Sequence, residues 1–198
     1  MAQPMLLMAA ARSKTVRRIA AGLVAFVLMM ILGIVVPLVA VPVLASANTG
    51  RVGAQPAVVG SWGYPLAGRY RITSGFGPRS VPDCSFCSTN HRGYDLAEAC
   101  GSPIYAAGPG TVIWADSWGT FGNAVQIDHG GGVATIYGHM MWNSLLVAVG
   151  TTVRAGTQLG LEGRTGVATG CHLHFEVRVH GVAIDPGPFM AARGLPLQ

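Results

Sequence analysis

Residues 171–179 form the segment with the clearest potential for chemistry, because CHLHFEVRV alternates strictly between polar and apolar side chains. On a β-strand, successive side chains point to opposite faces, so the apolar positions would face a core. The other face would carry His172, His174, Glu176 and Arg178. Histidines two residues apart have Cα atoms about 6.6–6.8 Å apart, so both rings can reach one metal ion, or an ion and its bound water. The pair alone is equally compatible with ordinary hydrogen-bonded histidines.

Residues 91–95, HRGYD, supply two more side chains of the right type. In a straight strand, residues four apart would be separated by roughly 13 Å, too far for both to bind one ion. Gly93 disfavours a helix and permits a bend, so we predict that the chain bends there. His91 and Asp95 are suitable zinc ligands, and two histidines with one carboxylate leave a fourth position for water, as a catalytic site requires. His139 is a fourth residue suited to this chemistry.

The elements that position these residues are predicted to be strands. From residue 64 onward glycine is frequent and apolar residues recur in short runs rather than at helical spacing, which indicates a mainly β domain with little helix. Glycines at 130–132 favour a hairpin turn, and a second turn is expected at 180–181. The predicted strands cover residues 70–73, 103–107, 110–115, 123–128, 133–138, 158–162, 172–180 and 182–184. The sequence thus predicts an antiparallel sheet with one face carrying the chemistry.

The order of the motifs resembles the signature of the M23, or lysostaphin/LytM-like, peptidases. Three pieces carry the resemblance: His91-x3-Asp95, then Tyr137-Gly138-His139, then residues 172–175, HLHF. Similar supporting pieces lie at residues 73–79, 101–104, 106–108, 122–123 and 128–130, and the match extends from about Tyr64 to Phe189. The combination of motifs in this order is far more specific than any one of them.

The resemblance implies a compact antiparallel β-sheet domain with a groove, of the LytM or duplicated-hybrid-motif type. It assigns one Zn²⁺ to His91, Asp95 and His174, and catalytic roles to His172 and His139. His172, beside the metal, would act as a general base, and His139 would stabilise an oxyanion or act as an acid. The expected activity is a zinc metalloendopeptidase that cuts cross-bridges or stem-peptide cross-links of bacterial peptidoglycan. The alternatives are a catalytically silent wall-binding or hydrolase-activating module, and a wall-opening peptidase of a larger envelope machine.

The N-terminal region has the pattern of a signal that directs membrane insertion or export. Residues 19–45 carry no charge and follow four basic residues within a cytoplasmic segment 1–18, which predicts a hydrophobic helix with its N-terminus inside. The helix is either a retained transmembrane anchor or a signal peptide cleaved after Ala45-Ser46-Ala47. We predict a linker at 46–63, a peptidase domain at 64–190 and a tail at 191–198. The domain would be exported, either anchored on the outer side of the membrane or secreted to the wall.

The net charge of +5 does not indicate nucleic-acid binding. Four of the thirteen basic residues, and none of the eight acidic ones, lie within residues 1–47, so the remainder is close to neutral. Nucleic-acid binding would need a clustered basic face instead. We therefore exclude this class of partner.

All four cysteines lie in the part predicted to be exported, where disulfides persist. Four cysteines allow three pairings. Our hypothesis is Cys84 with Cys87 and Cys100 with Cys171, because the latter two each lie close in sequence to a proposed site residue. A structural zinc site on Cys84 and Cys87 is the alternative, although it would need a second pair of ligands.

Two further residues, Glu176 and Arg79, have two interpretations each, and His129 has one. Glu176 either supports a metal ligand by hydrogen bonding or pairs with Arg178 or solvent. Arg79 orients either a substrate carboxylate or the loop around it. His129, in a glycine-rich turn, is interpreted as structural. Residues 80–90 are an insertion relative to the family pattern and are expected to shape one rim of the groove.

Overall fold

The computed structural model describes residues 55–81, 84–85 and 87–198. The predicted cytoplasmic segment 1–18 and hydrophobic helix 19–45 lie outside these residues, as does the first half of the predicted linker, residues 46–54. Within the described part of the chain, no helix is long and apolar enough to cross a membrane. These residues belong to the C-terminal compact unit of the chain.

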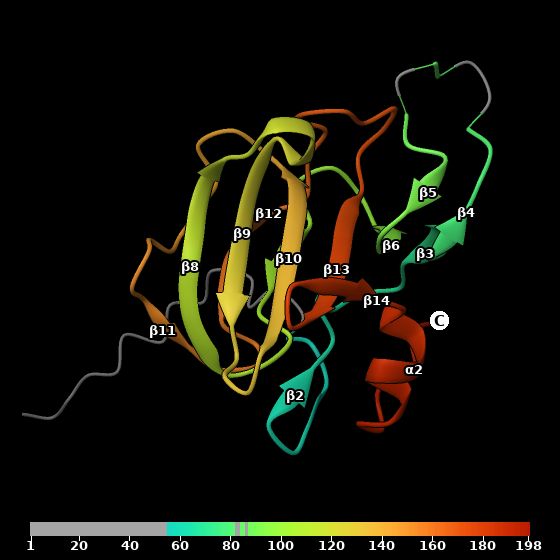
Figure 1. The fold of residues 1–198 in the computed structure, drawn as a ribbon. Helices are drawn as coiled ribbons and strands as arrows, with labels where there is room; N and C mark the ends of the chain where they lie inside the picture. The colour runs from blue at the N-terminus through green and yellow to red at the C-terminus, as the bar shows by residue number, and fades with distance from the viewer. Residues whose placement is uncertain (1–54, 82–83, 86) are drawn as a thin grey trace, which may run out of the picture. The chain divides into compact units, whose positions relative to one another are not determined.

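An eight-stranded antiparallel sheet dominates this unit (Figure 1). Its strands are β3 (Arg71–Ser74), β6 (Tyr94–Ala97), β8 (Gly110–Ser117), β9 (Asn123–Asp128), β10 (Val133–Met140), β11 (Thr152–Val153), β13 (Leu173–Val179) and β14 (Val182–Ile184). They are ordered β11-β8-β9-β10-β13-β6-β3, with β14 paired to β13. The mainly β, antiparallel fold predicted from the sequence is confirmed.

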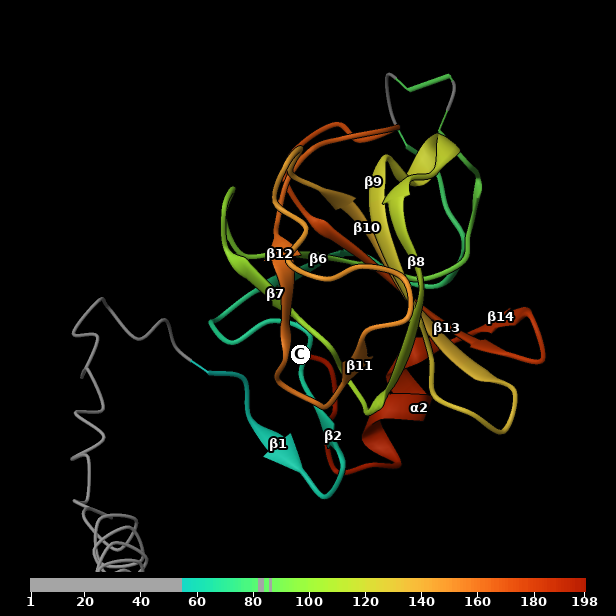
Figure 2. The ribbon, with the colours of Figure 1, turned by 90° about the vertical axis from the view of Figure 1, so that its left-hand side faces the viewer.

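Three two-stranded pairs accompany the sheet, and Figure 2 shows two of them, β1 with β2 and β7 beside β12. The pairs are β1 (Val58–Val59) with β2 (Trp62–Gly63), β4 (Gly77–Pro78) with β5 (Asn90–His91), and β7 (Pro103–Tyr105) with β12 (Gln158–Leu161). Helix is as scarce as predicted. The described residues contain one α-helix, α2 (Pro186–Ala191), and one 3-10 turn, η1 (Gly119–Phe121).

Each of the eight predicted strand segments contains a strand, but several short strands were not predicted. The most informative is the β1–β2 hairpin, which lies in the segment predicted as linker. The Gly63 amide donates to the Ala107 carbonyl at 2.8 Å, and Trp62 packs against the core. Ordered structure therefore begins before residue 64. At the other end, Leu195 is buried, so the segment predicted as a tail also contributes to the core.

The core lies against one face of β13, as its alternating pattern predicts. Leu173, Phe175 and Val177 are fully buried, whereas Val179 is only half-buried near the end of the strand. Burial of each such side chain stabilises the fold by about 1.5–3 kcal/mol. His174 and Glu176 on the opposite face are also buried, because loops cover that end of the sheet.

The two predicted turns have the backbone conformation that their residues suggest. Gly130, Gly131 and Gly132 all have positive φ, as do His180 and Gly181. Such angles favour glycine, which has no Cβ to clash. These turns connect β9 to β10 and β13 to β14, and so set the registers of these two antiparallel pairs.

Candidate metal centre

Two neighbouring strands place Asp95 and His174 side by side. In the antiparallel pair of β6 and β13, the two residues are directly opposite, so their side chains share one face. The predicted bend occurs between β5 and β6, at Arg92 and Gly93. A Cβ on Gly93 would lie 2.4 Å from the Phe175 carbonyl oxygen, so only glycine lets the chain pass β13 this closely. The bend then turns His91 back toward Asp95.

One atom from each of His91, Asp95 and His174 meets at a single point. His91 Nε2, Asp95 Oδ1 and His174 Nδ1 are 3.0 Å from one another. All three residues are buried, and within the described residues they are the one group whose ligand atoms lie close enough to hold a metal ion. Tetrahedral zinc with ligand bonds of about 2.0–2.1 Å separates its ligand atoms by roughly 3.3 Å, close to this spacing.

The hydrogen bonds around the two histidines fix which ring nitrogen faces the centre. His91 Nδ1 donates to the Gly75 carbonyl at 2.7 Å, which leaves the lone pair of Nε2 facing inward. His174 Nε2 donates to Glu176 Oε1 at 3.0 Å, which leaves the lone pair of Nδ1 facing inward. Three electron-pair donors therefore converge in a buried site. Such an arrangement requires a cation, and its two-imidazole, one-carboxylate chemistry fits zinc.

The electrostatics of the site also favour a positive charge at its centre. Burial alone would raise the pKa of Asp95, but the imidazoles of His172, His174 and His91 hold it well below its usual range. Burial would likewise lower the pKa of His174, yet hydrogen bonds and charges from Asp95 and Glu176 raise it. The carboxylate is thus anionic, and the pocket attracts a proton or a metal cation.

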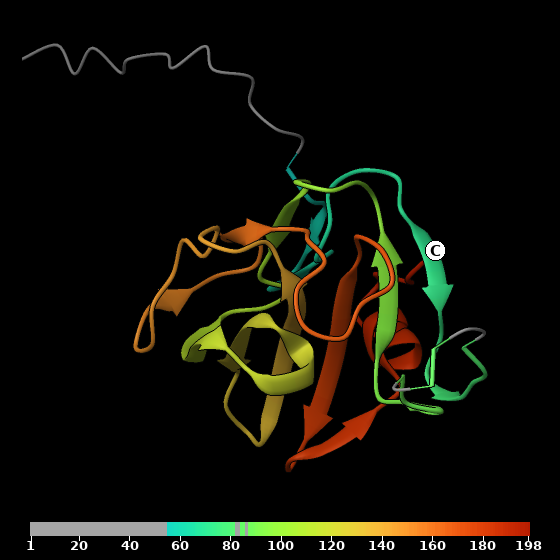
Figure 3. The same ribbon diagram turned by 90° about the horizontal axis from the view of Figure 1, so that it is seen from above.

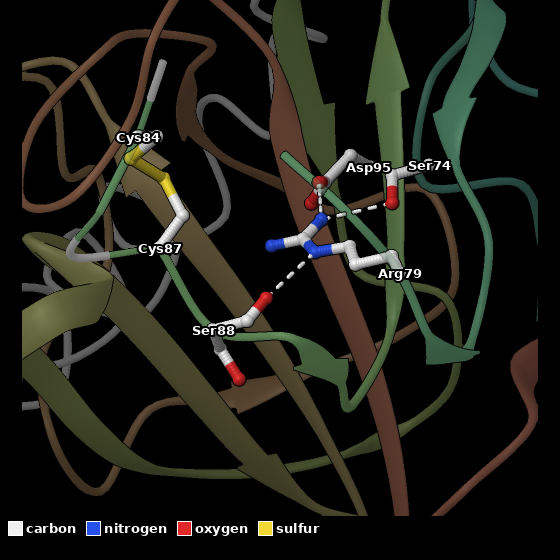
Figure 4. The surroundings of a disulfide bond; sticks show 6 residues. All are labelled: Ser74, Arg79, Cys84, Cys87, Ser88 and Asp95. Carbon is white, nitrogen blue, oxygen red and sulfur yellow. Dashed lines mark hydrogen bonds and ion pairs between the residues drawn. A yellow bond between two sulfur atoms is a disulfide. The ribbon is translucent and has the colours of Figure 1, made fainter. Parts of the chain in front are cut away.

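Two arginines hold the carboxylates from outside, and Figure 4 shows the first of them, Arg79, beside Asp95. Arg79 Nη1 donates to Asp95 Oδ2 at 2.7 Å and to Ser74 Oγ at 2.8 Å, while its Nε donates to the Ser88 carbonyl at 3.1 Å. Arg178 donates to Glu176 Oε2 at 2.8 Å. Arg79 therefore orients a carboxylate of the protein itself together with its loop. Glu176 combines both interpretations proposed for it, since it supports His174 and pairs with Arg178.

His172 and His139 lie beside the centre, each with one nitrogen held by a backbone carbonyl. His172 Nδ1 donates to the Gly170 carbonyl at 2.9 Å, and its Nε2 lies 3.4 Å from Asp95 Oδ1. His139 Nδ1 donates to the Thr165 carbonyl at 2.8 Å. The two ring centroids are 4.7 Å apart. Burial, reinforced by the neighbouring imidazoles, lowers the pKa of His139 to about 4, so this ring is neutral near pH 7.

A cleft of about 310 Å³ opens onto these residues. It lies between the 80–90 insertion and η1, at the end of the sheet seen from above in Figure 3. Its walls include Arg79, Cys87 and Ser88 on one side, Thr120 and Phe121 on the other, and His91, His139 and His174 at the base. An adjoining pocket of about 260 Å³ reaches Asp95 and His172. The expected groove and the rim formed by the insertion are both present.

Both hypothesised disulfides are present, Cys84–Cys87 and Cys100–Cys171. The alternative of a structural zinc site on Cys84 and Cys87 is therefore wrong, because both sulfurs are bonded to each other. The second bridge joins the loop after β6 to the residue immediately before His172. It thereby ties the loop that follows Asp95 to the segment that carries two site histidines.

Some contributors to the site had no clear signal in the sequence. The Gly75 and Thr165 carbonyls orient two histidines, yet any residue type can supply a backbone carbonyl. Phe121, whose ring centroid lies 5.5 Å from that of His174, comes from a loop without periodicity. His129, by contrast, lies outside the centre and bonds to the Pro109 carbonyl and Thr135 Oγ1, in agreement with its structural interpretation.

Comparison with known proteins identifies similar sequences and folds. Peptidase family M23 matches residues 89–186. The chain is 38% identical over 122 residues to peptidoglycan DD-endopeptidase ShyA of Vibrio cholerae, covering 62% of this chain and 28% of that protein. It is 38% identical over 116 residues to DD-carboxypeptidase/endopeptidase Mpg of Neisseria meningitidis, covering 59% of this chain and 26% of that protein. The chain thus spans less than a third of the length of these curated relatives.

Two solved structures have the same fold over most of the described domain. The catalytic domain of lysostaphin from Staphylococcus simulans superposes with a TM-score of 0.56 at 30% identity, covering 62% of this chain and 92% of that domain. A zinc-containing peptidase from Vibrio cholerae superposes with a TM-score of 0.56 at 35% identity, covering 66% of this chain and 39% of that one. The similarity to the lysostaphin domain extends over nearly its full length.

Proposed function

Because the chain belongs to peptidase family M23, we propose that it is a zinc endopeptidase that hydrolyses peptide bonds of bacterial peptidoglycan. One observation carries the proposal: three inward-facing electron-pair donors, from His91, Asp95 and His174, converge at the base of an open cleft beside two further imidazoles. The name of ShyA, a peptidoglycan DD-endopeptidase, supports the substrate class, and the names of Mpg and lysostaphin support peptidase activity.

The metal would be held by His91 Nε2, Asp95 Oδ1 and His174 Nδ1. When bound there, zinc supplies Lewis acidity that polarises a carbonyl group and acidifies a water molecule. The chain's own contribution is to keep both imidazoles in the correct tautomer through Gly75 and Glu176. Asp95 is held in place by Arg79.

His172 takes the role of general base. Its Nδ1 proton is committed to the Gly170 carbonyl, so the lone pair of Nε2 is free to accept a proton from the attacking water. Asp95 Oδ1, 3.4 Å from that nitrogen, stabilises the imidazolium that forms. Neither the tautomer nor the neighbouring charge needs to change before proton transfer.

His139 assists from the other side of the cleft. Its Nδ1 is also committed to a carbonyl, and its low pKa keeps the ring neutral before the reaction. In the neutral form Nε2 carries no proton, so this residue can only donate after it has received one. We assign it a relay role: it receives the water-derived proton from His172, whose ring centroid is 4.7 Å away, and then hydrogen-bonds the developing oxyanion or passes the proton to the leaving amine.

The domain would act outside the cytoplasm, with residues 19–45 as its export signal or anchor. Two disulfides among the described residues support this location, because such bonds persist in oxidising compartments. A catalytically silent wall-binding module is disfavoured, since all five histidine and aspartate side chains expected of the catalytic machinery line the cleft or its adjoining pocket.

Incubating the full 198-residue chain with purified peptidoglycan tests the proposal. We expect new amine and carboxyl ends on peptide cross-links by mass spectrometry, abolished by a chelator and restored by added zinc. A matched Asp95→Asn variant should release no such products. Zinc-loaded wild-type protein that binds peptidoglycan without cutting it would instead establish the binding-module alternative.

A further inference from the structure

A row of aromatic rings leads away from the candidate metal centre. The Phe121 centroid lies 5.5 Å from that of His174, the Trp118 centroid lies 5.1 Å from that of Phe121, and the Trp114 centroid lies 5.3 Å from that of Trp118. Phe121 fits close to the sheet because Gly138 has no side chain, and a Cβ there would lie 3.2 Å from the ring. The row is therefore continuous from the cleft to β8.

Strand registers place the far end of this row on the same sheet face as the centre. Trp114 on β8 is opposite Gln126 on β9, Gln126 is opposite Ile136 on β10, and Ile136 is opposite Glu176 on β13. Directly opposite residues of antiparallel strands share a face. β8 and β13 are three strand spacings apart, which is roughly 14 Å. Figure 1 shows these four strands side by side.

The exposed part of the row consists of aromatic carbon atoms, and polar side chains of nearby loop residues border it. Trp114 is 36% exposed, and its single donor, Nε1, already donates to the Asp116 carbonyl at 3.1 Å. What its exposed part offers a ligand is consequently the face of the indole ring. Trp118 and Phe121 are half-buried, and the exposed side chains of nearby loop residues, Asp116, Ser117 and Thr120, supply a carboxylate and hydroxyls.

We propose that the Trp114–Trp118–Phe121 row is a binding site for the glycan strand of the substrate. The proposal rests on the proposed function, because it takes the substrate to be a peptide attached to a sugar polymer. A pyranose ring presents C–H groups on its faces and hydroxyls at its edge, so it complements an aromatic face bordered by polar side chains. The cleft at the metal centre accommodates the peptide, and the row continues from the cleft wall at Phe121.

The exposed aromatic rings of the row favour a glycan ligand over a longer stretch of peptide. The row offers three aromatic rings whose successive centroids are 5.3 and 5.1 Å apart, and an extended ligand outside the cleft would lie across all three. The row thus holds the polymer while the cleft selects the bond.

The test compares two substrates with the same peptide cross-link, intact peptidoglycan and the sugar-free cross-linked peptide. We expect Trp114→Ala in the full chain to raise the half-saturating concentration of intact peptidoglycan about tenfold, equivalent to about 1.4 kcal/mol. The same variant should change cleavage of the sugar-free peptide less than twofold. Trp114→Phe, which keeps a ring face, should retain most of the binding. Trp142→Ala, at an exposed tryptophan outside the row, is the matched control.

A second experiment measures glycan binding and does not depend on catalysis. Peptide-free glycan strands should bind the wild-type chain and quench its tryptophan fluorescence, and Trp114→Ala should weaken that binding by a similar factor. Equal losses on both cleavage substrates would assign the row to peptide, and failure of peptide-free glycan to bind would overturn the proposal outright. If the wild-type chain cleaves neither substrate, the proposed function fails, while the binding arm still decides the role of the row.

Discussion

At the scale of single residues, two histidines two positions apart, His172 just before β13 and His174 on it, receive different roles from their hydrogen bonds. His174 Nε2 is committed to Glu176, so its Nδ1 faces Asp95, whereas His172 Nδ1 is committed to a backbone carbonyl. We expect His174→Ala to lose bound zinc. His172→Ala should keep close to one zinc per chain but lose turnover by about 10²–10⁴-fold, the usual contribution of a general base. Metal analysis beside kinetics checks both, and loss of zinc from His172→Ala would make it a ligand instead.

Arg79 acts on the metal only through Asp95. Its Nη1 donates to Asp95 Oδ2, and its Nε anchors the rim segment at Ser88. Removing such a supporting contact typically weakens metal binding by about 10–100-fold. We therefore expect Arg79→Ala to lower zinc affinity within that range, measured by competition with a chelating dye. Arg154→Ala, at an exposed loop arginine far from these contacts in sequence, should leave the affinity unchanged, and equal affinities for both variants would refute a positioning role for Arg79.

At the scale of elements, the approach of residues 91–95 to β13 depends on one missing side chain. A Cβ on Gly93 would lie 2.4 Å from the Phe175 carbonyl oxygen and 3.0 Å from Glu176 Cγ, so the strands must separate. We expect Gly93→Ala to lower the free energy of unfolding by about 1–3 kcal/mol, as overpacking commonly does. Gly75→Ala is the control, because an added methyl meets no atom within 4 Å there. Denaturant unfolding compares the two, and similar midpoints would show that the strands tolerate the methyl.

At the scale of the whole molecule, a buried carboxylate makes folding stability depend on pH. Glu162 is fully buried, and this burial raises its pKa to about 7 despite the hydrogen bond from the Glu98 backbone amide. A pKa raised above the unfolded value of 4.5 means that the native state holds the proton more tightly. The associated stability is therefore complete below about pH 4.5 and is lost as the pH rises through about 7.

The protonation of Glu162 changes the free energy of unfolding by roughly 3 kcal/mol between low pH, where its full contribution is present, and high pH, where it is lost. We expect Glu162→Gln, which keeps an acceptor for the Glu98 amide but carries no charge, to flatten the decline in unfolding free energy between about pH 5 and about pH 8. Urea unfolding at both pH values gives the comparison. Parallel slopes for the wild-type chain and the variant would mean that Glu162 is ionised throughout.

The sequence by itself determined the features that are written locally along the chain. Alternation of polar and apolar residues identified β13 and its buried face, and Gly93 identified the bend before Asp95. The types and order of the ligands, with the resemblance they carry, led to the cluster of His91, Asp95 and His174. The cysteine pairing also followed from the sequence. Cys84 and Cys87 are three residues apart, and Cys100 and Cys171 each lie close in sequence to a site residue.

Only the tertiary structure decided which groups from distant parts of the chain become neighbours. Strand register brought Trp114 onto the face of Glu176, and loop packing placed the Gly75 and Thr165 carbonyls against two histidines. Arg79 had two interpretations until its distance to Asp95 was known. The physical reason is that periodicity reports which face a side chain occupies, whereas tautomers, ion pairs and a ligand surface depend on contacts between strands that are remote in sequence.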